Sequence, residues 1–154
     1  MLKPGDKAPE FELPNADLEV TQSADYIGSK NLVLYFYPKD DTPGCTMEAT
    51  DFSDLVDGFE ALDTEVLGVS RDNCLSHGEF RDKHGLSIGL LADIEGILCE
   101  AYDVWREKEA HGKKRMVIMR STFVIDKAGT IRHALYDVKP KDHAAEVLEL
   151  VRSL

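Results

Sequence analysis

Long apolar segments are absent from this chain of 154 residues. The longest strongly apolar stretch, Leu32 to Tyr37, is far shorter than the ~20 residues of a membrane-spanning helix, and the first residues contain no apolar leader segment. Hydrophobic residues make up 43% and charged residues 31% of the chain, which excludes collagen-like and disordered classes. We therefore expect one soluble, cytoplasmic domain spanning residues 1–154, with no membrane partner.

Positive charge and cysteine are also scarce. There are 18 lysine and arginine residues against 29 aspartate and glutamate residues, so the net charge of −11 repels nucleic acid and we expect no nucleic-acid partner. Three cysteines are too few, and odd in number, for a secreted disulfide scaffold. Cys74 and His77 have ligand-like spacing, but no matching second pair accompanies them, so we predict no metal site.

Strand and helix patterns alternate along the chain. Residues 10–13 and 18–20 alternate polar and apolar positions and predict a small hairpin, while Leu32 to Tyr37 is apolar on both faces, as in a central strand covered on each side. We expect further strands over residues 66–69, 88–92, 121–125 and 130–136, and helices over residues 45–60, 74–84, 94–102 and from an N-cap at Asp142 onward. This order predicts an α/β fold, with a central mixed sheet and helices on both faces.

Two connecting segments have patterns of their own. Six of the basic residues lie between Trp105 and Arg120, and we interpret this segment as a solvated loop and an edge strand. Residues 126–129 separate two predicted antiparallel strands, and Gly129 can take the left-handed position of a bulged hairpin turn.

Cys45 stands where a central strand has ended and a helix begins, which is where active sites of open α/β sheets lie. The positive end of the helix dipole and the unpaired N–H groups of the first turn stabilise a thiolate there. Thr42 can turn its hydroxyl toward the sulfur, and Pro38 and Pro43 make the approach rigid. We expect the turn that contains Pro43 to favour exposure of the thiol over packing.

Two other thiol chemistries do not fit this turn. A Cys-x-x-Cys redox pair needs a second cysteine at position 42 or 48, which here are Thr42 and Glu48. A cysteine protease needs a base, and none of the five histidines stands in a recognisable protease context. Dithiol exchange at this turn and proteolysis are therefore disfavoured.

The pattern Pro38-x-x-x-Thr42-x-x-Cys45 resembles the active-site signature of the peroxiredoxins. Further segments are similar to the bacterioferritin comigratory protein, or peroxiredoxin Q, group: residues 35–39, 43–46, 5–9, 68–72 and 120–126. The resemblance implies a thioredoxin-like fold and reduction of hydrogen peroxide or organic hydroperoxides, with Cys45 as the peroxidatic cysteine and Arg120 as the active-site arginine. It also implies electrons from thioredoxin or a similar thiol, and no metal, haem or flavin cofactor.

The chemistry of peroxide cleavage supports the same residues. A thiolate that breaks an O–O bond needs an ionised sulfur, a group that holds the attacked oxygen, and positive charge for the leaving oxygen. Cys45, Thr42 and Arg120 supply one each, with Pro38 beside them in the substrate site. Glu48, one turn into the helix, either orients Arg120 or is an ordinary exposed helical residue.

The resolving cysteine departs from the pattern of that group. Members place it five residues after the first, here Thr50, or in the following helix, at the position of Arg81. Cys74 shares a helix face with Arg81 and is the candidate substitute, provided that local unwinding brings it to Cys45. Cys99 lies in a short apolar helix, where we expect it to pack as a small hydrophobic residue.

Three functional alternatives follow from the sequence. The first is a thiol-dependent peroxidase, a monomer or weak dimer, whose oxidised Cys45 is resolved by Cys74 or taken directly by an external thiol. The second is a redox sensor or holdase chaperone switched by oxidation of Cys45. A non-catalytic binding module is disfavoured, because it has no need for Thr42, Cys45 and Arg120 together. We expect the peroxidase.

Overall fold

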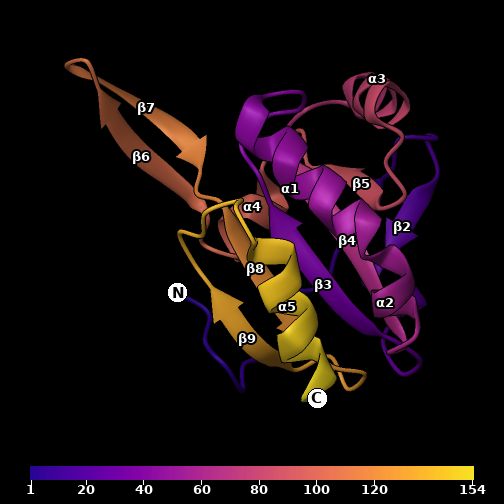
Figure 1. Cartoon of the computed structure of the whole chain (residues 1–154). Helices are drawn as coiled ribbons and strands as arrows, with labels where there is room; N and C mark the ends of the chain where they lie inside the picture. Colours follow the sequence, from indigo (N-terminus) through magenta and orange to yellow (C-terminus); the bar gives the residue numbers. More distant parts are fainter.

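A five-stranded mixed sheet forms the centre of the computed structural model, which describes all 154 residues (Figure 1). Its strand order is β5-β4-β3-β8-β9. β3 (Asn31–Phe36) pairs in parallel with β4 (Thr64–Ser70), and β4 pairs in parallel with β5 (Gly89–Ala92). On its other side β3 pairs antiparallel with β8 (Ser121–Ile125), which pairs antiparallel with β9 (Ile131–Leu135). The predicted α/β fold with a central mixed sheet is confirmed.

The central strand is buried on both faces because its side chains alternate between two hydrophobic clusters. Val33 and Tyr35 enter one cluster, and Leu32 and Leu34 enter the other. This explains the uninterrupted apolar segment in the sequence. Burial of both faces leaves only the strand ends open for chemistry.

Helices cover both faces of the sheet. Four helices contribute to the cluster around Val33: α1 (Pro43–Asp54), α2 (Val56–Glu60), α3 (Cys74–His84) and α5 (His143–Arg152). The opposite cluster contains residues of α4 (Ile97–Ala101) and of the N-terminal segment. Figure 1 shows α1 and α5 lying across the same face of the sheet. None of these helices is long and apolar enough to cross a membrane.

The helix expected over residues 45–60 is wrong as a single element. Leu55 leaves helical geometry between α1 and α2, and its N–H bonds to the carbonyl oxygens of Phe52 and Ser53. Phe52 and Phe59 still both reach the core, so the apolar stripe was assigned correctly. After the break α2 lies near α5, where a Cβ on Gly58 would be 3.3 Å from Leu148 Cδ2.

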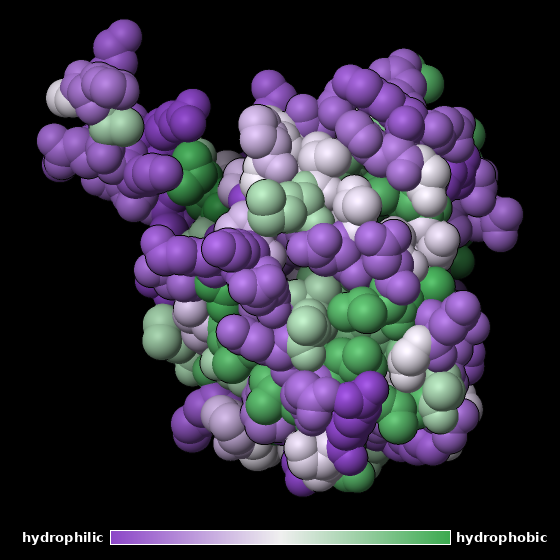
Figure 2. All heavy atoms as spheres, in the orientation of Figure 1, coloured by the Kyte–Doolittle hydropathy of each residue, from purple (hydrophilic) through white to green (hydrophobic).

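The basic segment forms a separate hairpin and is not an edge strand of the main sheet. β6 (Trp105–Ala110) and β7 (Lys113–Ile118) pair only with each other. Ile118 is the one buried residue of the two strands, and Trp105 packs half-buried against the same cluster, so only the base of the hairpin contacts the core. Figures 1 and 2 show it projecting from the body with a hydrophilic outer half.

The remaining connections follow the sequence patterns with small shifts. The N-terminal hairpin consists of β1 (Glu12–Pro14) and β2 (Val20–Gln22), followed by the short 3-10 helix Ser23–Asp25. The turn before β9 has Gly129 at a φ of 82° and a bulge in the preceding pairing, as predicted. Asp142 does precede α5, but its carboxylate caps no backbone N–H, because its own backbone is left-handed with a φ of 61°.

Candidate active site

Cys45 lies in the first turn of α1, which follows the loop after the central strand β3. Thr42 is the N-cap residue, and its carbonyl oxygen accepts the N–H of Thr46 at 2.8 Å. The N–H groups of Gly44 and Cys45 precede this first intrahelical bond and are free to face an anion. The β3–α1 connection therefore places the sulfur at the positive end of a helix, as the sequence predicted.

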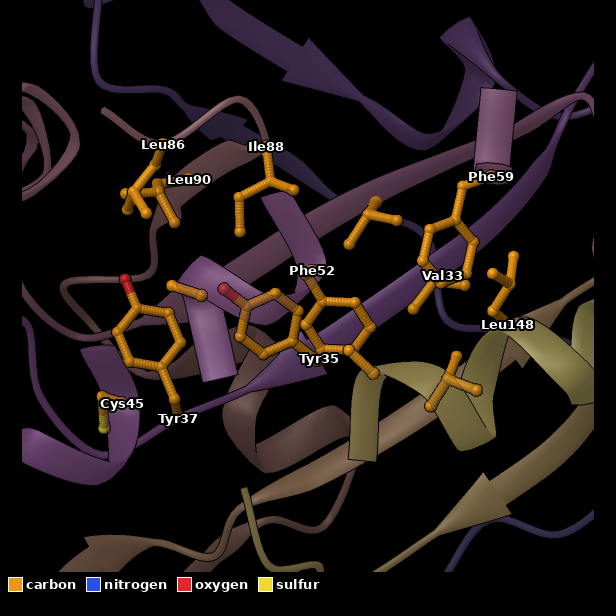
Figure 3. Packing of buried hydrophobic residues seen from close by; sticks show 14 of the residues in the cluster. Val33, Tyr35, Tyr37, Cys45, Phe52, Phe59, Leu86, Ile88, Leu90 and Leu148 are labelled. Carbon is orange, nitrogen blue, oxygen red and sulfur yellow. The ribbon is translucent and has the colours of Figure 1, made fainter. Parts of the chain in front are cut away.

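The expectation that the thiol is exposed is wrong. Cys45 is only 1% exposed and belongs to the same hydrophobic cluster as Tyr35 and Tyr37. Figure 3 shows Cys45 at the end of a row of packed rings formed by Tyr37, Tyr35 and Phe52. The first turn of α1 directs this side chain inward, so the turn exposes Pro43 and not the sulfur. Thr42 and Gly44, which precede Cys45 in the chain, are half-buried.

Arg120 is the residue that reaches the sulfur. Its Nη2 donates to Cys45 Sγ at 3.4 Å, and its Nη1 donates to Glu48 Oε1 at 2.8 Å. The pairing of β8 with β3 places Ser121 opposite Phe36, so Arg120 stands beyond the carboxyl end of β3. Burial lowers the pKa of Arg120, but the charges of Glu48 and Cys45 outweigh burial and raise it. The guanidinium therefore holds a fixed positive charge at the sulfur.

Glu48 is a buried partner of Arg120 and not an exposed helical residue. Its side chain is fully buried, and burial raises its pKa to about 7 although Arg120 acts to lower it. Only Oε1 has a hydrogen-bond partner, while Oε2 and the nearby Tyr35 hydroxyl have none. Near neutral pH this carboxyl is thus poised between its charged and neutral forms.

Gly44 makes room for Arg120. A Cβ at this position would lie 3.1 Å from Arg120 Nη2 and 3.3 Å from Pro140 Cγ. No local sequence pattern predicts this role, because only the fold brings residue 120 beside residue 44. A glycine directly before a helix-start cysteine was the one available indication.

The structure corrects the orientation expected of Thr42. Its hydroxyl donates to the carbonyl oxygen of Lys39 at 2.8 Å instead of pointing its proton at the sulfur. The Thr42 oxygen keeps free lone pairs, so it can accept a hydrogen bond from a bound hydroperoxide. Pro38 is exposed and lies beside a hollow between this loop and the base of the β6–β7 hairpin.

All three cysteines are unpaired and buried. Cys99 is fully buried in the cluster opposite α1, and burial followed by the neighbouring Asp93 raises its pKa, so it packs as predicted. Cys74 begins α3, and Arg81 on the same helix binds Asp17 and Asp82. A disulfide between Cys45 and Cys74 stays a prediction about the oxidised protein.

Comparison with known proteins identifies the family. The model of the AhpC/TSA family matches residues 4–134. The chain belongs to this family. Peroxiredoxin Bcp of Bacillus subtilis is 49% identical over 150 residues, which covers 97% of this chain and 95% of the relative. The chain is therefore a peroxiredoxin, an oxidoreductase of the group that the sequence resembles.

Solved structures of peroxiredoxins have the same fold. A cysteine-to-serine mutant of Xylella fastidiosa PrxQ superposes with a TM-score of 0.94 at 38% identity, covering 99% of this chain and 97% of that chain. The bacterioferritin comigratory protein of Xanthomonas campestris, studied for its alkyl peroxide reduction activity, has a TM-score of 0.88 at 38% identity and covers 93% of this chain and 90% of that chain. The predicted thioredoxin-like peroxiredoxin fold is confirmed.

Proposed function

We propose that this peroxiredoxin reduces hydrogen peroxide and organic hydroperoxides through Cys45 and is recycled by thioredoxin or a similar thiol. The observation that carries the proposal is the contact between Arg120 Nη2 and Cys45 Sγ at 3.4 Å, at the N-terminus of α1. A buried cation and a helix N-terminus both stabilise negative charge that develops near them. The family relationship supports a hydroperoxide substrate and a thiol reductant.

In the first step the Cys45 thiolate attacks one oxygen of the hydroperoxide. An S–O bond forms, the O–O bond breaks, and the leaving oxygen takes a proton from solvent to give water or an alcohol. Thr42 Oγ1, whose proton is donated to Lys39, accepts the hydroperoxide O–H. Arg120 and the N–H groups of Gly44 and Cys45 stabilise the negative charge on the oxygens.

In the second step a thiol sulfur attacks the Cys45 sulfenic acid, a disulfide forms and water leaves. Cys74 is the resolving thiol of this proposal, in an oxidised state in which the starts of α1 and α3 have unwound. The reductant then cleaves the disulfide by thiol exchange. Peptide mapping of wild type, Cys74→Ser and Cys99→Ser after one equivalent of peroxide tests this step. A disulfide that persists in Cys74→Ser, or a stable sulfenic acid in wild type, contradicts the role of Cys74.

The roles of Thr42 and Arg120 are tested by stopped-flow oxidation. We expect Thr42→Val and Arg120→Ala each to slow oxidation of Cys45 by ~100-fold or more, since loss of one preorganised group costs ~3–4 kcal/mol and each 1.36 kcal/mol is about tenfold in rate. Arg132→Ala, an arginine on β9 whose nearest carboxylate is Asp126 at 3.6 Å, is the matched control. Rates within threefold of the control contradict the assignment.

A further inference from the structure

A second buried pair of ionisable side chains lies between the active-site loop, residues 38–42, and helix α3. Asp40 Oδ2 is 2.7 Å from His77 Nδ1, and the two side chains are 4% and 0% exposed. Nothing in the peroxide reaction described above uses this pair. Taking ionisable groups out of water costs free energy that their hydrogen bonds at best repay, so the pair calls for a physical role.

Hydrogen bonds join the two side chains to each other and to their surroundings. His77 Nε2 is 2.9 Å from the carbonyl oxygen of Leu91, which can only accept, so Nε2 carries a proton. Asp40 accepts hydrogen bonds from the hydroxyls of Tyr37 at 2.6 Å and Ser76 at 2.7 Å. His77 Nδ1 and Asp40 Oδ2 therefore share the remaining proton of the pair in a short hydrogen bond of 2.7 Å.

Every polar atom of this pair is satisfied by a different part of the fold. Tyr37 directly follows β3, Leu91 lies in β5, and Ser76 and His77 lie in α3. Asp40 itself is held further through its N–H, which donates to Asp72 at 2.8 Å. The carboxylate thus ties the active-site loop to the sheet and to α3 at once.

The same loop and helix carry the groups that react. Thr42 lies two residues after Asp40, and its hydroxyl is fixed by the Lys39 carbonyl within the loop. On α3, Cys74 and His77 are buried residues one turn apart on one face of the helix. Movement of His77 away from Asp40 therefore loosens both the loop before Cys45 and the first turn of α3.

We propose that Asp40 and His77 are positioning residues that hold the active-site loop against α3 in the arrangement that reacts with peroxide. Separation of the pair accompanies the unwinding that exposes oxidised Cys45 to a thiol. The inference rests on the proposed function of Cys45. It adds that the Asp40–His77 pair sets the balance between oxidation of Cys45 by peroxide and capture of the oxidised sulfur by a thiol.

The test compares two neighbouring carboxylates that tie the same loop to the same helix. Asp41 is exposed and binds Lys83 and His84 of α3 at 2.6 and 2.8 Å, so Asp41→Asn is the matched control for Asp40→Asn. Stopped-flow oxidation with hydrogen peroxide gives the first step. Capture of the sulfenic acid by N-acetylcysteine, measured by mass spectrometry after quenching, gives the second.

We expect Asp40→Asn and His77→Gln to slow oxidation of Cys45 by ~10-fold or more and to speed capture by ~3-fold or more, while Asp41→Asn stays within ~2-fold of wild type in both steps. Changes of opposite sign in the two steps are not produced by a merely structural role. Equal changes in both steps, or no difference from Asp41→Asn, overturn the proposal. Absence of Cys45 oxidation in wild type would instead refute the proposed function.

Hydrogen exchange in the wild-type protein keeps the proposal testable if the variants fold poorly. We expect the protected amides of residues 38–42 to exchange together with the amides of α3, with exchange rates within ~10-fold of each other. Exchange of the loop that is faster than exchange of α3 by more than this factor overturns the proposal.

Discussion

At the scale of single residues, the site is a series of three ionisable side chains in contact, from Glu48 through Arg120 to Cys45. Each contact is direct: 2.8 Å between Glu48 Oε1 and Arg120 Nη1, and 3.4 Å between Arg120 Nη2 and Cys45 Sγ. The protonation of Glu48 therefore decides how much of the guanidinium charge is left for the sulfur and the leaving oxygen.

Replacement of Glu48 by glutamine tests this coupling. Burial raises the pKa of Glu48 to about 7, so the carboxyl is neutral well below that pH and charged well above it. Glutamine keeps an acceptor for Arg120 and resembles the neutral form. We expect the ratio of Glu48→Gln to wild-type oxidation rates to rise from about 1 to ~3 or more as the pH passes this midpoint. A ratio that is flat with pH in stopped-flow measurements contradicts the coupling.

Gly44 allows a second test at this scale. In Gly44→Ala the new methyl group meets Arg120 Nη2 at 3.1 Å, so we expect oxidation of Cys45 to slow by ~10-fold. Alanine within a helix is favoured over glycine by ~1 kcal/mol, so urea denaturation should show no large loss of stability. Gly78→Ala in α3, whose Cβ meets only the Ala16 carbonyl oxygen at 3.6 Å, is the control. An unchanged oxidation rate in Gly44→Ala would show that Arg120 has room to move.

At this scale, the sequence predicts which residues form the site better than it predicts how their side chains are oriented. Cys45 was singled out by its position at a helix start and Arg120 by the resemblance to the peroxiredoxins together with its place before a strand, while Glu48 was left open between a partner of Arg120 and an exposed helical residue. The space required at Gly44 depends on atoms that lie far along the chain. The orientation of Thr42 depends on which of two acceptors its hydroxyl bonds to. Local pattern does not determine these features.

At the scale of elements, the apolar segment of β3 and the stripes of the long helices placed the core correctly. The break at Leu55 and the separate β6–β7 hairpin were missed. A helix stripe continues through a one-residue break with its apolar side chains still inward, so periodicity does not reveal the break. The hairpin has too little apolar surface to join the sheet, a matter of packing that the basic composition only hinted at.

Shortening this hairpin tests its independence from the core. Lys108 pairs with Arg115 and Glu107 with Met116, so residues 108–115 can be replaced by a two-residue Asn-Gly turn that preserves the inner pairs. We expect the free energy of unfolding to stay within ~1 kcal/mol of wild type, since nearly all of the removed side chains are exposed. A loss of more than ~2 kcal/mol in urea denaturation would mean that the hairpin supports the core.

At the scale of the whole molecule, two buried groups near the site, Glu48 and His143, make the free energy of unfolding change with pH in opposite directions. Burial raises the pKa of Glu48 to about 7, so the folded state binds an extra proton between the unfolded value and that pH, and stability falls as pH rises through this range. Burial, assisted by Arg120, lowers the pKa of His143 to about 4. The unfolded state then binds the extra proton, and stability is lost as pH falls from the ordinary histidine value toward 4.

The contributions of Glu48 and His143 to the free energy of unfolding change in opposite directions over nearly the same pH range, so wild-type stability should vary little with pH there. Removing the Glu48 contribution in Glu48→Gln leaves that of His143, and we expect its free energy of unfolding to rise relative to wild type as pH increases from about 4 to about 7. Urea denaturation midpoints at several pH values measure this. Parallel profiles for the two proteins would show that folding does not raise the pKa of Glu48.

The most direct test of the whole account is peptide mapping by mass spectrometry after one equivalent of hydrogen peroxide, with peroxide consumption by Cys45→Ser measured alongside. We predict that the Cys45 peptide carries one added oxygen atom or a disulfide, that Cys99 stays a thiol, and that Cys45→Ser does not consume peroxide. Oxidation of Cys74 or Cys99 with the Cys45 thiol intact, or consumption by a folded Cys45→Ser at more than a few per cent of the wild-type rate, would contradict the claim that Cys45 attacks the peroxide.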